Sequence, residues 1–210
     1  MTSVILLLCM LSSLLSTVYS ARCIDCSYRN GETCKNEENI VDCGESGCVT
    51  LSESCLVNSY NVPAIKKGCA EGINESQVLA LNDKDQLKTT VNIEYCKEDL
   101  CNKGTQFVYV DNLGEPTGKY CESCYRNNTS NECVSRDRVA CHGNQIKCLS
   151  YIGKLSRADG TIGDYSIKGC VSDLICTLKF GSLPGTKELE GKLFECSAPL
   201  TEPIDCSGCE

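Results

Sequence analysis

The residues of this chain that are best able to do chemistry are its cysteines, which make up 20 of its 210 residues. Cys-x-x-Cys spacing can hold zinc or act as a redox dithiol. That spacing occurs three times, at Cys23 and Cys26, at Cys121 and Cys124, and at Cys206 and Cys209. The only histidine, His142, directly follows Cys141, which raises the question of a Cys–His nucleophile pair. Residue types alone therefore leave metal binding, redox chemistry, catalysis and structural bridging as alternatives.

The order of the cysteines separates these alternatives. Nineteen follow a hydrophobic leader, and the first six recur about a hundred residues later. The first set is Cys23, Cys26, Cys34, Cys43, Cys48 and Cys69, and the second is Cys121, Cys124, Cys133, Cys141, Cys148 and Cys170. Matching members are offset by 98, 98, 99, 98, 100 and 101 residues. Offsets this constant indicate one module used twice. In such a repeat we expect the cysteines to be structural.

The composition favours a disulfide scaffold without an active site. The chain has no Trp, three Phe and nine Tyr, so each repeat of about ninety residues has few large apolar side chains for a core. A native bridge in a small secreted domain contributes roughly 2–5 kcal/mol, and several would compensate. The sequence shows neither a Ser-His-Asp set nor a Gly-rich phosphate loop. We expect no enzyme activity, cofactor or metal, and a surface position for His142.

The first twenty residues predict a signal peptide. Apolar runs at residues 4–8 and 11–15 precede Val18-Tyr19-Ser20, which places small residues where signal peptidase requires them. Cleavage is expected between Ser20 and Ala21. No second apolar stretch follows, and the C-terminal residues are polar, so we expect no membrane anchor. The number of cysteines also requires an oxidising compartment. The sequence therefore predicts a secreted, extracellular protein.

The charge of the chain is negative and uneven. The net charge is −8, of which residues 21–104 contribute −5 and residues 119–210 contribute −1. Nucleic-acid binding is disfavoured because contact with phosphates needs the opposite sign. A cationic partner fits this charge, and so does the alternative that acidity only keeps the protein soluble.

The local patterns predict strands and turns. Residues 90–95 alternate, which places Val91, Ile93 and Tyr95 on one face. Residues 147–153 and 164–168 also predict strands, joined by a hairpin turn at Asp159-Gly160. No stretch has sustained helical periodicity. The fold class is therefore all-β, with one module at 21–104, a linker at 105–118 and a second module at 119–210. The short linker predicts that the modules touch.

Each repeat resembles the three-finger domain of the lymphocyte-antigen-6 and urokinase-receptor family. The matching features are Cys-x-x-Cys at the module start, Lys-Gly-Cys at the end of the second finger, and the closing residues Tyr95 to Asn102. The family closes its module with paired cysteines, four residues, then Cys-Asn, and Tyr95 stands here in place of the first paired cysteine. The resemblance implies that Asn102 is buried and hydrogen-bonded to the sheet. The fold expected is two tandem disulfide-rich three-finger domains.

The resemblance also implies the disulfide pairs. They are Cys23–Cys48, Cys26–Cys34, Cys43–Cys69 and Cys96–Cys101 in repeat one, and Cys121–Cys148, Cys124–Cys133, Cys141–Cys170 and Cys176–Cys196 in repeat two. Repeat one lacks the family's third-finger bridge, so residues 70–95 should be looser. Repeat two ends instead in a possible Cys206–Cys209 pair. Nineteen is an odd number, and Cys55 is the candidate for an unpaired cysteine, either buried or bridged to another chain.

Binding is the function that the resemblance implies, since three-finger modules present hairpin faces to partners. Tyrosine and apolar residues on rigid hairpins make good interface anchors. The candidates on the second fingers are Tyr60, Val62, Ile65, Tyr151, Ile152, Tyr165 and Ile167. The alternative is that these residues cover the sheet between the modules. Sequons at Asn74, Asn127 and Asn128 predict glycans in loops, with at most one at the overlapping pair.

The two-module, anchor-free organisation is most similar to gamma-type phospholipase A2 inhibitors of vertebrate plasma. This similarity rests on residues 147–172 and on Phe194-Glu195-Cys196. The resemblance implies a non-catalytic inhibitor that binds a secreted phospholipase A2. The alternative is a secreted pheromone of the amphibian sodefrin-precursor-like type, which also diverges in the cysteines of its first repeat. A receptor-like decoy or an ion-channel modulator is a third possibility, and an oligomer is compatible with the odd cysteine.

Overall fold

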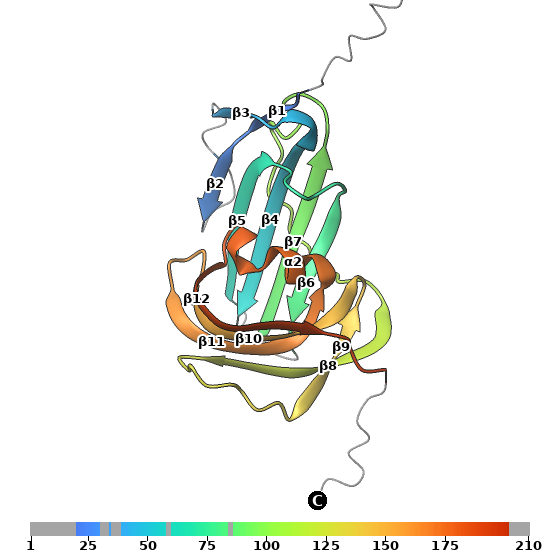
Figure 1. Cartoon of the computed structure of the whole chain (residues 1–210), viewed down its shortest axis with the longest axis vertical. Helices are drawn as coiled ribbons and strands as arrows, with labels where there is room; N and C mark the ends of the chain where they lie inside the picture. The colour runs from blue at the N-terminus through green and yellow to red at the C-terminus, as the bar shows by residue number, and fades with distance from the viewer. Residues whose placement is uncertain (1–19, 30–33, 35–38, 58–59, 84–85, 202–210) are drawn as a thin grey trace, which may run out of the picture.

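The computed structural model describes residues 20–29, 34, 39–57, 60–83 and 86–201. Residues 1–19 of the expected signal peptide lie outside the described residues, as does the possible Cys206–Cys209 pair. The regular structure of the described part is almost entirely β-strand and forms two units (Figure 1). The long strands of repeat one run along the long axis of the molecule, and those of repeat two run across it at one end. None of the described helices is long and apolar enough to cross a membrane.

Repeat one is a small two-stranded layer above a larger sheet. The small layer pairs β1 (Arg22–Ile24) with β3 (Ile40–Asp42), followed by the 3-10 helix η1 (Gly44–Ser46). The larger sheet contains β2 (Cys26–Arg29), β4 (Cys48–Val57), β5 (Tyr60–Cys69), β6 (Gln77–Asn82) and β7 (Leu87–Cys96). Its order is β6-β7-β4-β5-β2, and every neighbouring pair is antiparallel. The alternation predicted in β7 is present, since Val91 and Ile93 are buried and Tyr95 is half-buried.

Repeat two keeps the first two fingers and changes the third. Its strands are β8 (Pro116–Asn127), β9 (Asp137–His142), β10 (Gln145–Ser156), β11 (Ile162–Ser172) and β12 (Lys187–Ser197). The β10–β11 hairpin turns at Asp159-Gly160, where Gly160 has a φ of +85°. Between β11 and β12 lie a helix, α2 (Asp173–Leu178), and a 3-10 helix, η2 (Phe180–Ser182). The sequence did not predict α2, because six residues are too few to show helical periodicity.

The two repeats share one sheet and one core. Strand β6 pairs with β11 through Leu81 and Val171 and through Asn82 and Cys170, which joins the sheets. A single cluster of buried apolar residues draws on β4, β6 and β7 of repeat one and on β10, β11, α2 and η2 of repeat two. Burial of apolar area is the main favourable term in folding. The modules therefore touch, as the short linker predicts, and stabilise each other.

In the part of the chain that the structure describes, eight disulfides hold the fingers together. They join Cys23–Cys48, Cys26–Cys34, Cys43–Cys69, Cys96–Cys101, Cys121–Cys148, Cys124–Cys133, Cys141–Cys170 and Cys176–Cys196. These are the pairs that the family resemblance implies. Asn102 is buried beside them, where its amide accepts from Ile24 N at 2.9 Å and donates to Ile24 O at 2.9 Å. Asn102 thereby ties the closing loop of repeat one to β1.

The segment between the modules lies along repeat one. Residues 105–115 have no regular structure, and β8 begins at Pro116, inside the range expected for the linker. Thr105 Oγ1 lies 2.8 Å from Thr50 Oγ1, and Val108 N donates to Ser52 Oγ at 3.2 Å. Thr90 Oγ1 donates to Val110 O at 3.2 Å. The face of the sheet that carries Thr50, Ser52 and Thr90 is thus covered by the segment that leads into repeat two.

Candidate partner-binding groove

Most of the contact residues expected from the sequence are inside the molecule. Val62, Ile65, Tyr151, Tyr165 and Ile167 are at most 5% exposed. The expectation that they contact a partner is therefore wrong for these five. The causes of burial differ. Val62 packs with Ala158 of repeat two, and Tyr165 and Ile167 lie against Cys55 and Leu81 of repeat one, so for these three the alternative that such residues lie between the modules holds. Tyr151 is instead covered by Phe180 and Phe194 of its own repeat.

The remaining two candidates are accessible to different degrees. Tyr60, at the start of β5, is 59% exposed, and Ile152 on β10 is half-buried. Tyr151, its neighbour, faces inward and packs edge-on against Phe180 at 4.8 Å between ring centroids. Phe194 of β12 completes this cluster at 5.6 Å from Phe180. Period-two alternation thus sends one residue to the core and the next toward solvent.

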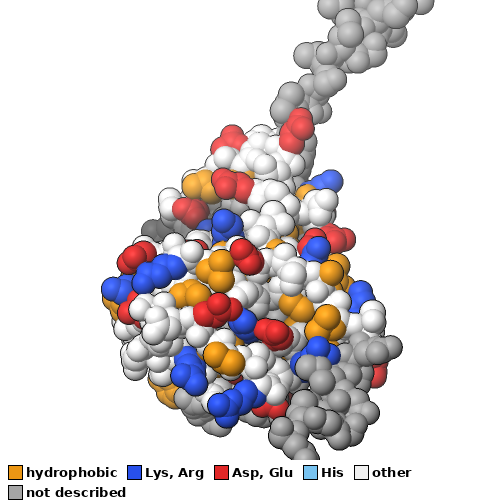
Figure 2. Space-filling model, turned by 60° about the horizontal axis from the view of Figure 1, so that its bottom comes forward, with side chains coloured by type: hydrophobic (Ala, Val, Ile, Leu, Met, Phe, Trp, Pro, Cys, Tyr) orange, Lys and Arg blue, Asp and Glu red, His pale blue; other side chains and the backbone are white. Residues whose placement is uncertain are grey.

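The surface of repeat two carries no single large apolar patch on the face seen in Figure 2. Basic, acidic and isolated apolar side chains are interspersed there. Scattered apolar residues are normal on a protein surface, whereas a contiguous patch marks an interaction site. A concave site at the module junction is therefore the better candidate for partner binding.

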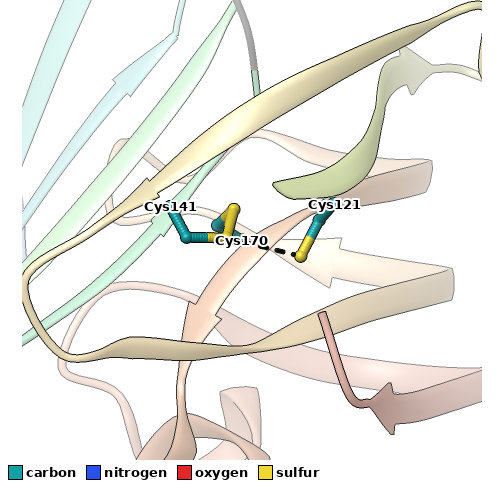
Figure 3. A group of neighbouring side chains, drawn as sticks. All are labelled: Cys121, Cys141 and Cys170. Atoms are coloured by element: carbon teal, nitrogen blue, oxygen red, sulfur yellow. Dashed lines mark hydrogen bonds between the residues drawn. A yellow bond between two sulfur atoms is a disulfide. The ribbon is translucent and has the colours of Figure 1, made fainter. Parts of the chain in front are cut away.

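The tight cysteine cluster of repeat two is not a metal site. Sulfur atoms of Cys121, Cys141 and Cys170 lie within 4.8 Å of one another (Figure 3). Metal binding requires thiolates. Cys141 and Cys170 are bonded to each other, and Cys121 is bonded to Cys148. All three sulfurs are therefore committed to disulfides, and their proximity reflects two bridges packed side by side.

A groove of about 340 Å³ lies where repeat one meets α2 and η2 of repeat two. Its apolar lining comes from Val49 and Leu51 of β4, Ile73 after β5, and Leu178 of α2. Val49, Leu51 and Ile73 are largely buried, and Leu178 is half-buried. Ligand sites are concave, mainly apolar and furnished with a few placed polar groups. This groove combines an apolar lining with several polar groups, and its lining comes from both repeats.

Three charged side chains stand at the groove. Lys66 and Glu71 are exposed, and Asp25 is half-buried. Asp25 is positioned by the small layer, because its backbone N–H donates to Asn39 O at 2.8 Å. Two carboxylates against one ammonium leave a net negative charge at the groove. The acidic balance of repeat one continues into this site.

A buried carboxylate holds the wall of the groove in place. Glu53 of β4 is fully buried and accepts from Gly185 N at 2.6 Å and from Thr186 N at 3.1 Å, in the segment between η2 and β12. Thr186 Oγ1 also donates to it at 2.5 Å. Burial raises the pKa of Glu53, and these three hydrogen bonds oppose that rise. Glu53 therefore anchors the segment that carries the η2 side of the groove.

Arg29 of β2 makes a second polar tie at the same junction. Its Nη2 donates to Gly185 O at 2.6 Å and to Arg157 O at 2.8 Å. It also donates to Ser156 O at 3.2 Å. Charge-assisted hydrogen bonds are stronger than neutral ones and require a defined geometry. Glu53 and Arg29, both from repeat one, thus hold repeat two in its orientation through hydrogen bonds to its backbone.

A larger groove, of about 490 Å³, lies beside the segment between the modules and is a weaker candidate. Its charged groups bind each other or the backbone. Lys88 pairs with Asp111 at 3.0 Å, and Asp83 accepts from Leu87 N at 2.7 Å. His142 lies here, with Nδ1 at 3.1 Å from Gly114 O. His142 therefore contacts a loop carbonyl, and neighbouring Cys141 is committed to a disulfide.

The three sequons are accessible. Asn74 is exposed and directly follows Ile73 of the groove lining, and Asn127 and Asn128 are exposed. Asn127 is the last residue of β8 rather than a loop residue, because it pairs with Tyr165. Asn128 follows with a φ of +56°. An occupied Asn74 would stand at the rim of the groove.

Cys55 is unpaired among the described residues and is 6% exposed. Thr89 Oγ1 donates to its sulfur at 3.3 Å. Burial is the main cause of its raised pKa, which keeps it a neutral thiol at physiological pH. Its place in the shared core supports the buried-thiol alternative over a bridge to another chain.

The comparisons with known proteins agree with this architecture. The u-PAR/Ly-6 domain model matches residues 20–104 and 117–190. Similar curated proteins are gamma subunits of phospholipase A2 inhibitors, one from Elaphe climacophora and one from Elaphe quadrivirgata. Each is 26% identical over 179 residues, which cover 83% of this chain and 85% of the relative. A further phospholipase A2 inhibitor of the gamma type, from Trimerodytes annularis, is 27% identical over 151 residues, which cover 70% of this chain and 75% of the relative.

A solved structure, that of mouse TEX101, aligns with a TM-score of 0.38 and 15% identity. The alignment covers 85% of this chain and 99% of that chain.

Proposed function

Since this chain belongs to the u-PAR/Ly-6 domain family, with two such domains, we propose that it is a secreted binding protein that inhibits a secreted phospholipase A2. Inhibition would come from direct contact that blocks the enzyme's access to lipid. The protein itself is not an enzyme, in keeping with its inhibitor relatives and its family.

The observation that carries this proposal is the extent of the likeness to the inhibitors. It spans 179 residues and therefore includes both repeats rather than one module alone. The junction between the repeats builds the groove, so a relative that shares only one module could not share it. The two-module relatives are named phospholipase A2 inhibitors, and the same organisation in this chain supports the same class of partner.

The groove suggests what the contact looks like. Its apolar lining would receive an apolar side chain of the enzyme, which contributes roughly 1.5–3 kcal/mol when fully buried. Asp25 and Glu71 would face basic groups around that side chain. Charges at the rim of an interface mainly speed association and select partners. A basic phospholipase is therefore expected to bind faster than an acidic one.

A titration of the oxidised protein against acidic and basic secreted phospholipases A2 tests the proposal. Inhibition of lipid hydrolysis and direct binding are followed together. Saturable inhibition with a defined stoichiometry is expected for at least one basic enzyme. An absence of binding to every enzyme at micromolar concentration would remove the inhibitor proposal and leave the secreted-signal alternative.

Two substitutions locate the contact. Glu71→Lys reverses an exposed charge at the groove and should slow association with a basic phospholipase about tenfold. Glu190→Lys is the matched control, because Glu190 is an exposed residue of β12 outside the groove lining. Inhibition that responds equally to both changes would place the contact elsewhere on the molecule.

A further inference from the structure

The loop between β5 and β6 carries part of the groove lining and a sequon. Glu71 and Ile73 line the groove, and the sequon at residues 74–76 follows them directly. Ile73 is 8% exposed, whereas Asn74 is exposed to solvent. Neighbouring Cα atoms are about 3.8 Å apart across a trans peptide. The acceptor amide of the sequon therefore belongs to the immediate chain neighbour of the apolar wall.

Hydrogen bonds hold both ends of this loop. The backbone N–H of Ile73 donates to Ala70 O at 2.8 Å. At the other end of the loop, the backbone N–H of Tyr95 in β7 donates to Ser76 Oγ at 2.8 Å. The position of Asn74 at the rim of the groove is therefore set by the fold.

A protein partner that fills the groove must also cover its rim. Specific interfaces bury about 800 Å² on each partner and involve about 20–30 residues a side. The groove is lined by 11 described residues, so the contact has to extend to their neighbours. Asn74 is such a neighbour, because it adjoins Ile73 and is exposed. A glycan is bulky and hydrophilic. A glycan on Asn74 and a phospholipase in the groove would therefore compete for the same space.

The attachment of a glycan to Asn74 is a group transfer from a lipid-linked oligosaccharide. A bond forms between Nδ2 of Asn74 and the anomeric carbon of the sugar. The bond from that carbon to the lipid diphosphate breaks, and the proton lost by the amide neutralises the departing diphosphate. The sequon needs the hydroxyl of Ser76. In the folded protein this hydroxyl accepts a hydrogen bond from Tyr95 N. Transfer therefore competes with the folding of β7, and both an occupied and an unoccupied form are expected.

We propose that Asn74 is a glycosylation site whose occupancy decides whether the groove is open to a protein partner. The glycan covers the rim and excludes the partner, and the unglycosylated form is the one that binds. Asn127 and Asn128 have no such role, because neither residue lines the groove. This role of Asn74 rests on the proposed function, since a phospholipase A2 is the partner that reports whether the groove is open.

Secretion from cells that perform N-glycosylation tests the site, with occupancy measured by mass spectrometry of the glycopeptide. Occupied Asn74 is expected in the unaltered protein and in Ser76→Thr, which keeps the sequon and its hydroxyl. Asn74→Gln removes the glycan and should bind a basic phospholipase A2 at least about tenfold more tightly than the occupied form. The control variant combines Asn127→Gln with Ser130→Ala, which removes both other sequons, and its affinity should be unchanged. In that background a lectin column separates the occupied form from the unoccupied one.

An unoccupied Asn74 in the secreted protein would overturn the proposal, and so would an occupied form that binds as tightly as Asn74→Gln. If neither form binds any phospholipase, the proposed function fails and a second readout decides the role of the glycan. A bulky amine-reactive polymer should label Lys66, an exposed residue of the groove, several-fold more slowly in the occupied form. Lys187 of β12 is exposed outside the groove and should react equally in both forms. Equal labelling of Lys66 in the two forms would show that the glycan leaves the groove open.

Discussion

The third fingers of the two repeats reach stability by different routes. In repeat one the finger is the β6–β7 hairpin, and among its described residues no disulfide crosses it. Its outer strand β6 pairs with β11, and Leu79 and Leu81 are at most 1% exposed. In repeat two the finger is α2, η2 and the edge strand β12, whose residues are mostly exposed or half-buried. There Cys176–Cys196 ties the helix to the strand. Burial against a neighbouring module can therefore take the place of a bridge.

This comparison changes the expectation that residues 70–95 are loose. The missing bridge would loosen an isolated module, but the structure places this finger in the shared core. How tightly it is held remains a prediction, which the following experiments address.

The largest effect on stability is expected from a charge placed in the third finger of repeat one. Leu81→Asp places a carboxylate in the core between the modules, where an unpaired charge is very costly. We expect a loss of more than about 4 kcal/mol in the free energy of unfolding. Leu189→Asp in β12 is the matched control, because Leu189 is 53% exposed and its change should stay within about 0.5 kcal/mol. Urea unfolding with intact disulfides measures both, and equal losses would contradict the comparison.

The stability of the third finger of repeat two should depend on the Cys176–Cys196 disulfide. Replacing both Cys176 and Cys196 by Ala should cost about 3 kcal/mol, since the bridge closes a loop across a separation of 20 residues. The same change should weaken phospholipase binding, because α2 carries Leu178 to the groove. Stability is measured by urea unfolding and affinity by titration. A variant as stable as the parent would show that packing of Phe180 and Phe194 alone holds this finger.

The hydrogen bonds of Glu53 to repeat two should contribute slightly less to the free energy of unfolding than the Cys176–Cys196 disulfide. Glu53→Ala leaves the N–H groups of Gly185 and Thr186 buried without an acceptor. Unsatisfied buried donors cost about 1–3 kcal/mol, so we expect a loss of about 2 kcal/mol. Calorimetry of this variant beside Glu190→Ala, an exposed glutamate, isolates the effect of burial. Identical transitions would mean that water replaces the lost acceptor.

The smallest effect is a dependence on pH. The folded protein raises the pKa of Glu53 above its ordinary value of 4.5, mainly through burial. The native state therefore holds this proton more tightly than the unfolded chain does. Stability relative to a Glu53→Gln variant, which cannot titrate, should fall as pH rises from about 4.5 through the raised pKa. Tm measured for both proteins across this window tests the sign, and a relative rise in stability would reverse it.

The sequence predicted the framework better than the site. The constant cysteine offsets indicated the repeat, and the resemblance to the three-finger family, not spacing, implied the bridges and the buried position of Asn102. The strand predicted at residues 147–153 matched β10, but the sequence offered both Tyr151 and Ile152 as contact residues and could not show that Phe180 and Phe194 cover Tyr151. The groove joins Ile73 to Leu178, residues that no local pattern connects. The helix α2 is too short for periodicity, and the one local signal for it is Ser172 at the N-cap followed by Asp173 in the first turn.

Hydrogen exchange of the protein with and without a saturating basic phospholipase A2 tests the central claim most directly. The account predicts slowed exchange in two segments that are distant in sequence, residues 66–73 of repeat one and 178–182 of repeat two. The β12 edge at residues 187–192 should be unchanged and serves as an internal control. Protection confined to one repeat, or located at β12 while the groove exchanges freely, would contradict a binding site built by the junction of the two modules.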